Sequence, residues 1–136
     1  MIHVFCNERG AGKTKELISL ANNKIVDTKG DSVFIDDDFK YVRQIDRRIR
    51  FISTSDYDKL DCEGFYGLLC GLISSNYDIE NIYIDSILKI VSCSSKEMAY
   101  LFKKIECLAN KFNINLYINL NYRDNEVPEF VKEYVA

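Results

Sequence analysis

The feature that most constrains the fold is the alternation of short apolar runs with longer helical segments. The first run, Ile2–Cys6, is rich in β-branched and apolar residues and predicts a buried strand. The segment that follows a Gly-containing turn, Lys13–Asn23, has its apolar residues on one side and predicts a helix. Repetition of this alternation predicts an α/β fold: a three-layer α/β/α arrangement around a mostly parallel, about five-stranded sheet.

The other elements follow the same pattern. Cys62–Ser75 is apolar nearly all round and predicts a buried helix, whereas Ser94–Phe112 is the clearest amphipathic helix. Its predicted N-cap is Ser94 or Ser95, and its apolar stripe consists of Met98, Leu101, Phe102, Ile105 and Leu108. Further strands are predicted at Val33–Ile35, Ile49–Ser53, Asn81–Ser86 and Asn115–Leu120, and further helices at 39–47 and 129–135.

Length and charge limit the classes of protein. The 136 residues suffice for one domain, which we expect to span 1–136. The net charge of -3 does not support a broadly basic nucleic-acid-binding surface, although arginines gather locally between residues 43 and 50. A solvated face is the more ordinary interpretation of that local cluster.

The cysteines and the N-terminus bear on location. The five cysteines are odd in number, have no C-x-x-C spacing and accompany a single His, so a zinc site is not expected. Scattered cysteines of this kind are typical of reduced thiols in a cytosolic protein. We find no signal-peptide pattern and no apolar stretch of about 18 residues, and therefore expect a cytoplasmic protein without a membrane span.

The most specific motif follows the first predicted strand. Residues 7–14, NERGAGKT, nearly match the phosphate-loop (P-loop) pattern G-x-x-x-x-G-K-[ST], with Asn7 in place of the first Gly. Asn tolerates left-handed backbone angles better than most residues, so the loop conformation remains accessible. The loop and the helix N-terminus would direct backbone N–H groups at phosphate oxygens. The expected nucleotide-binding residues are Asn7, Glu8, Arg9, Gly10, Ala11, Gly12, Lys13, Thr14 and Lys15.

Acidic residues lie at the ends of two other predicted strands. Asp85 ends the run Ile82-Tyr83-Ile84, as the Mg²⁺-binding carboxylate of the Walker B arrangement does, and Thr14 would supply a second metal ligand. Asp36, Asp37 and Asp38 follow Ile35, and one of them would polarise an attacking water. The alternative for these three is a loop of acids that favours the positive end of the next helix.

The order of motifs resembles the RecA/KaiC-type P-loop ATPases. GAGKT, VFIDDD, IYIDS, a long amphipathic helix and NLYINLN occur here in that family's order. The resemblance implies that Asp36 or Asp37 takes the place of the catalytic Glu and that Asn119 or Asn121 senses the γ-phosphate. It also places Arg123 where some members carry a basic finger that acts across a subunit interface. Asp in place of Glu, like Asn7 in place of Gly, puts hydrolysis more in question than binding.

A second resemblance covers only the first motif. VFCNERGAGKTKELISLA is similar to the opening segment of the type II thymidine kinases, which carry G-x-x-x-[SA]-G-K-T-x-E-L. That family also has a cysteine-built zinc lasso and a Glu after the magnesium carboxylate, whereas this chain has no such cysteines and has Ser86 after Asp85.

These patterns predict a slow, Mg²⁺-dependent ATPase with catalytic roles for Lys13, Asp36, Asp37 and Asp85. ATP is favoured over GTP as the nucleotide. Two alternatives stay open: a nucleotide-dependent binding module with little or no hydrolysis, and a small-molecule, nucleoside-type kinase. A domain this small would act through self-association as a homo-oligomer or through a protein partner.

Overall fold

A five-stranded, all-parallel sheet forms the centre of the protein. The structure, a computed structural model, describes residues 1–6, 12–122 and 127–135. The sheet confirms the predicted α/β class, and its order β1-β5-β4-β2-β3 means that chain neighbours are joined by crossovers. The strands are β1 (Ile2–Cys6), β2 (Asp31–Asp36), β3 (Ile49–Ser53), β4 (Ile79–Ile84) and β5 (Asn115–Leu120).

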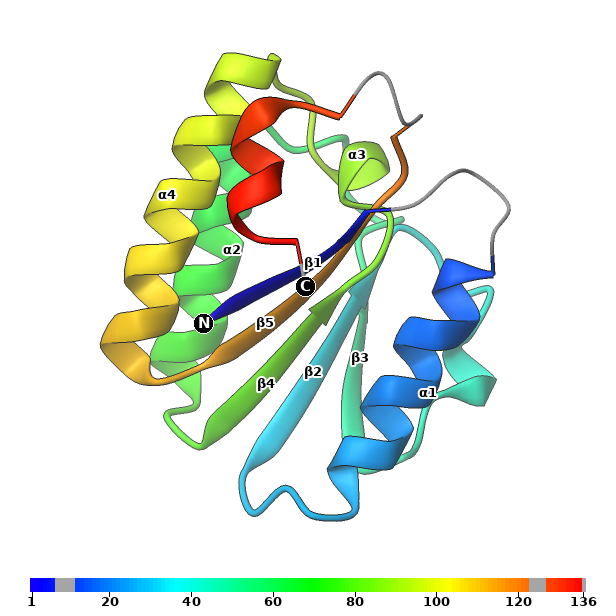
Figure 1. Cartoon of the computed structure of the whole chain (residues 1–136). Coiled ribbons are helices and arrows are strands. Elements are labelled where there is room, and N and C mark those ends of the chain that lie inside the picture. Colours follow the sequence, from blue (N-terminus) through cyan, green and yellow to red (C-terminus); the bar gives the residue numbers. More distant parts are fainter. Residues whose placement is uncertain (7–11, 123–126, 136) are drawn as a thin grey trace.

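Helices pack on both faces of this sheet, an arrangement compatible with three α/β/α layers. Figure 1 shows α2 and α4 side by side on one face and α1 on the other. The α-helices are α1 (Lys13–Ile25), α2 (Cys62–Ser75), α3 (Ile87–Ile90) and α4 (Ser95–Phe112), and short 3₁₀ turns are η1 (Val42–Gln44) and η3 (Glu129–Glu133).

Helix α4 forms where its sequence predicts it. Ser94 is the N-cap: its Oγ accepts from the Glu97 N–H at 3.2 Å, and the Glu97 carboxylate accepts from the Ser94 N–H at 3.1 Å. At the other end, Asn113 adopts a left-handed conformation that ends the helix. All members of the predicted apolar stripe are buried: Met98, Leu101, Phe102, Ile105 and Leu108.

The two faces of the sheet carry different cores. On the α2/α4 face the buried strand residues are aliphatic, including Val33, Ile35, Ile82 and Ile84. On the α1 face, one row of stacked rings crosses all five strands. Successive ring centroids are 4.8 Å apart for His3–Tyr117, 5.0 Å for Tyr117–Tyr83, 6.1 Å for Tyr83–Phe34 and 5.9 Å for Phe34–Phe51. We call this set the aromatic row.

The predicted helix over 39–47 is wrong, because only η1 forms there. Two carboxylates bind backbone N–H groups of this connection: Asp38 accepts from Lys40 and Asp46 from Arg48, each at 2.9 Å. Such local bonds compete with helical bonds. The prediction that α2 is a buried helix holds for only one of its sides, since Gly67, Gly71 and Ser74 are exposed.

Two shorter elements differ from prediction. The strand expected at Asn81–Ser86 begins earlier, at Ile79, and ends before Asp85, because α3 follows within three residues. The expected terminal helix at 129–135 is the 3₁₀ turn η3. After η3 the chain reaches the edge of β1, where the Val4 N–H donates to the Tyr134 carbonyl at 2.9 Å.

The expectation of five reduced cysteines is wrong for one pair. Cys62, the first residue of α2, forms a disulfide with Cys93, which precedes the α4 cap, and their Cα atoms are 6.1 Å apart. The preceding segments are already paired, since Leu60 exchanges backbone hydrogen bonds with the 90–92 segment at 3.0 and 2.7 Å. Because crossover topology brings the two residues together, sequence spacing gave no signal. Within the described residues, no helix has the length and apolar character needed to cross a membrane.

Candidate functional site at the carboxyl edge of the sheet

Four neighbouring strands end in polar residues on the α1 face. The registered pairs Ile84–Ile118, Ile35–Ile84 and Asp36–Ser53 place Asn119, Asp85, Asp36 and Ser53 in one line, immediately above the aromatic row. All four are at least nine-tenths buried. Ligands of parallel α/β sheets bind outside this carboxyl edge, so the line, which we call the polar row, is the candidate site.

Asp85 is the residue with unused hydrogen-bonding capacity. It is 1% exposed, and its Oδ1 accepts from the Ser86 N–H at 3.0 Å and from Asn119 Nδ2 at 3.4 Å. Its Oδ2 has no hydrogen-bond partner among the described residues. A buried oxygen of this kind is costly unless a ligand completes its coordination.

Asn119 links Asp85 to the start of α1. Its Nδ2 also donates to the Lys13 carbonyl at 3.0 Å. The predicted phosphate-binding helix and the predicted metal carboxylate, 72 positions apart in the sequence, therefore share one amide group. Asn121, the alternative sensor position, is exposed.

Asp36 lies beside Asp85 on the next strand and is 2% exposed. Its Oδ1 accepts from the Asp37 N–H at 2.7 Å. Burial raises the pKa of Asp36 to about 8, and the neighbouring carboxyl groups of Asp37 and Asp85 add to this increase. Two adjacent carboxylates in this position resist simultaneous ionisation unless a cation joins them.

The other acids extend this negative site outward. One carboxylate oxygen from each of Asp36, Asp37 and Asp38 lies within 4.8 Å of the others. Asp37 is half-buried and Asp38 is exposed. The helix whose start they were alternatively expected to favour does not form.

Lys13 and Thr14 open α1, as the phosphate-loop pattern requires. Gly12 before them has φ +71°, a left-handed angle that favours glycine. Lys13 is half-buried, and its Nζ pairs with Glu16 at 2.9 Å. Lys15 lies on the exposed side of α1. The predicted loop residues Asn7, Glu8, Arg9, Gly10 and Ala11, and the predicted finger Arg123, lie outside the described residues.

Sequence reasoning missed the contribution of β3. Ser53 completes the polar row, and buried Thr54 donates its N–H to the Asp36 carbonyl at 3.0 Å. The only available signal was a predicted strand that ends in hydroxyl residues. Ser86, at φ 61°, is a second missed feature: this rare angle turns the chain directly after Asp85 and directs the Ser86 N–H at its carboxylate.

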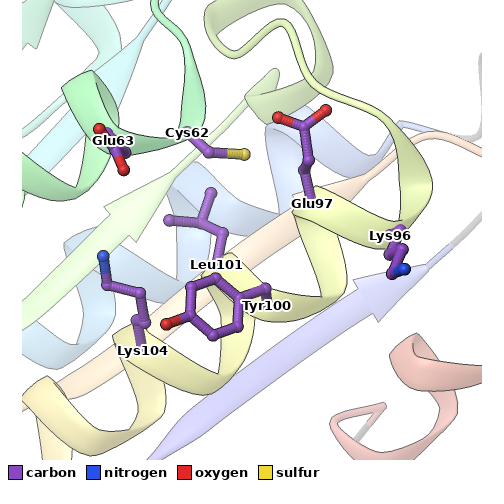
Figure 2. A pocket seen from close by; sticks show the side chains of 7 residues that line it. All are labelled: Cys62, Glu63, Lys96, Glu97, Tyr100, Leu101 and Lys104. Atoms are coloured by element: carbon purple, nitrogen blue, oxygen red, sulfur yellow. The ribbon is translucent and has the colours of Figure 1, made fainter.

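A separate pocket of about 350 Å³ lies between the beginnings of α2 and α4 (Figure 2). Lys104 Nζ sits 4.1 Å from the Tyr66 ring centroid near this pocket. None of the predicted site residues contributes to it. Its lining residues are Cys62, Glu63, Lys96, Glu97, Tyr100, Leu101 and Lys104.

Comparison of the sequence with models of known protein families and with curated proteins found no match. The geometry of the polar row therefore carries the functional argument.

Proposed function

We propose that the protein binds ATP through a P-loop and hydrolyses it slowly with Mg²⁺. One observation carries the proposal: Asp85 presents a buried Oδ2 that no group of the described residues bonds, and Asn119 connects the same carboxylate to the first residue of α1. A free carboxylate oxygen next to a Lys-Thr helix start is the arrangement that a metal-bound triphosphate requires.

The donor set fits Mg²⁺. This ion prefers oxygen ligands, takes few from the protein and retains several waters. Asp85 Oδ2 and the Thr14 hydroxyl would supply those few. The bound ion would offset charge on the β- and γ-phosphate oxygens, and it would also relieve the repulsion between Asp85 and Asp36.

The residues of this chain would divide the remaining tasks. Lys13 would leave Glu16, its present partner, and contact the β- and γ-phosphates. The backbone of residues 7–12 would surround the phosphates, with Lys15 at the margin. Asp36 or Asp37 would orient the attacking water, and Asn119 would contact the γ-phosphate from the α1 side. Positioning and charge stabilisation would supply most of the rate enhancement.

The first experiment is thermal unfolding with and without MgATP, MgADP and MgGTP. A ligand present at about 100 times its Kd raises the free energy of unfolding by roughly 2.7 kcal/mol. We therefore expect the wild-type Tm to rise by several degrees. Lys13→Ala should abolish the shift. Lys29→Ala is the matched control, because Lys29 is exposed and lies after the far end of α1.

Turnover is measured next, as release of inorganic phosphate. Asp85→Ala and Asp36→Ala should lower it at saturating MgATP. Binding without turnover in the wild type would instead favour the nucleotide-dependent binding module. Phosphate transfer to a nucleoside would favour the kinase. If no nucleotide shifts the wild-type Tm, the proposed site is wrong.

The cytoplasmic location stays a prediction. The Cys62–Cys93 disulfide removes the part of its support that came from reduced cysteines.

A further inference from the structure

The two edges of the sheet are finished differently. At the β1 edge, the Val4 N–H bonds to Tyr134 and Val4 forms a parallel bridge with Val135, so the segment after η3 covers this strand (Figure 1). At the other edge, β2 is the only strand that pairs with β3 within the described residues. The Ile49 N–H donates to the Asp46 carbonyl at 2.9 Å, and the outward N–H and C=O groups of Phe51 and Ser53 are available to another strand.

β3 lacks two of the features by which edge strands avoid such pairing, a Pro and a β-bulge. Its sequence, Ile-Arg-Phe-Ile-Ser, contains no Pro, and its register with β2 is unbroken over all five residues. Its only charge is Arg50. Two exposed aromatic residues flank it: Phe39, 53% exposed, lies 6.0 Å from the Phe51 ring, and Tyr57, 60% exposed, follows the strand. Exposed apolar surface beside an open edge is typical of an interaction site.

We propose that a second copy of this chain pairs with β3, antiparallel, around a two-fold axis at Phe51. In this register each strand residue has a partner, since Ile49 faces Ser53 and Phe51 faces Phe51 of the second copy. Arg50 faces Ile52 rather than another Arg50, so like charges do not meet. The contact is isologous and closes as a dimer.

Charges beyond the strand also match in this register. In this register Arg47 faces Ser55 of the second copy and lies one position from its Asp56. Asp46 faces that Asp56, and Arg48, which binds Asp46 at 2.9 Å, offsets the charge of this acidic pair, twice per dimer. On the α1 face, the aromatic row ends at half-exposed Phe51, and the second copy would continue it across the axis. These matches favour a second copy over an unrelated partner.

Sedimentation equilibrium without nucleotide tests the dimer apart from the proposed ATP site. We expect reversible, concentration-dependent dimerisation of the wild type. Ile52→Arg places like charges opposite each other at both symmetric pairs, and should weaken association by about tenfold or more. The double variant Arg50→Glu/Ile52→Arg restores opposite charges in the same register and should regain it.

Both variants carry the same change at Ile52, so a loss of stability caused by that change is common to the two. Their Tm values measure it. Hydrogen exchange of the wild type needs no substitution: the amides of Phe51 and Ser53, which alternate with those that face β2, should gain protection as protein concentration rises. A wild type that stays monomeric, or exchange at Phe51 and Ser53 that does not depend on concentration, would overturn the proposal. A double variant that remains as weak as Ile52→Arg would overturn the register.

Discussion

The two faces of the sheet use the same strands for different purposes. On the α2/α4 face, aliphatic side chains interlock with two long helices, and a disulfide joins those helices at one end. On the α1 face, the aromatic row supports a line of buried polar residues, and one oxygen of this line, Asp85 Oδ2, has no hydrogen-bond partner among the described residues. The comparison indicates that one face supplies most of the stability, and that the other sacrifices stability to hold unsatisfied groups in place.

The largest expected effect comes from breaking the aliphatic face. Phe102 is fully buried and packs edge-on against Phe130, with ring centroids 5.3 Å apart. Phe102→Ala should lower the free energy of unfolding by about 3–5 kcal/mol in a denaturant titration. Tyr100→Ala is the control on the same helix, because Tyr100 is 69% exposed and should change stability little. Equal losses of unfolding free energy for the two variants would contradict the view that the buried side of α4 carries the stability.

The next effect tests the connection between α2 and α4. Cys62 and Cys93 are 31 residues apart, and closing a loop of that length contributes about 3–4 kcal/mol in the chain-entropy description. Cys62→Ser, or a reductant, should lower the Tm by several degrees. Cys107→Ser is the control, since that thiol is exposed and free. Thiol titration of the unfolded, unreduced chain should detect three thiols; detection of all five would contradict the pairing.

A pH-dependent effect distinguishes the α1 face. The pKa of Asp36 is raised from 3.8 to about 8, so the folded state keeps a proton that the unfolded state has lost between these values. The contribution of Asp36 to stability is therefore lost as pH rises through this window. Without divalent cations, the wild-type Tm should fall over this window, and Asp36→Asn should flatten the slope. Exposed Asp38→Asn should leave the slope unchanged; a flat wild-type profile would count against a buried carboxyl group.

The smallest effect concerns Tyr83 in the aromatic row. Its hydroxyl group is buried and has no hydrogen-bond partner among the described residues. Tyr83→Phe should raise the free energy of unfolding by about 1 kcal/mol, because it removes an unsatisfied polar group and keeps the ring. Tyr77→Phe, at a 76% exposed position, should be neutral. Loss of stability in Tyr83→Phe would show that the hydroxyl group has a partner after all.

Local patterns predicted the regular elements well, because each was encoded within one segment. The stripe on α4 and the apolar runs of the strands fixed their boundaries to within a few residues. The helix predicted over 39–47 does not form, because Asp38 and Asp46 bind backbone N–H groups that a helix would need. The sequence did not predict α3, because a single helical turn has too few residues to show a helical period of apolar residues.

The polar row was predictable only in part. Asp36 follows one predicted strand, and Asp85 and Asn119 lie in the last two residues of two others, so their shared edge was expected. Their order along that edge depends on which strands are neighbours, and no local pattern specifies it. For the same reason, the sequence did not predict that Ser53 is the neighbour of Asp36 or that Cys93 is the partner of Cys62.

The aromatic row also gives the protein an optical reporter. The chain contains no Trp, so tyrosine dominates its near-ultraviolet circular dichroism. Tyr83 and Tyr117 stack at 5.0 Å, each two residues before a member of the polar row. Rings held so close couple electronically, and their signal depends on the angle between β4 and β5. A shift of either strand end would therefore be visible in solution without any label.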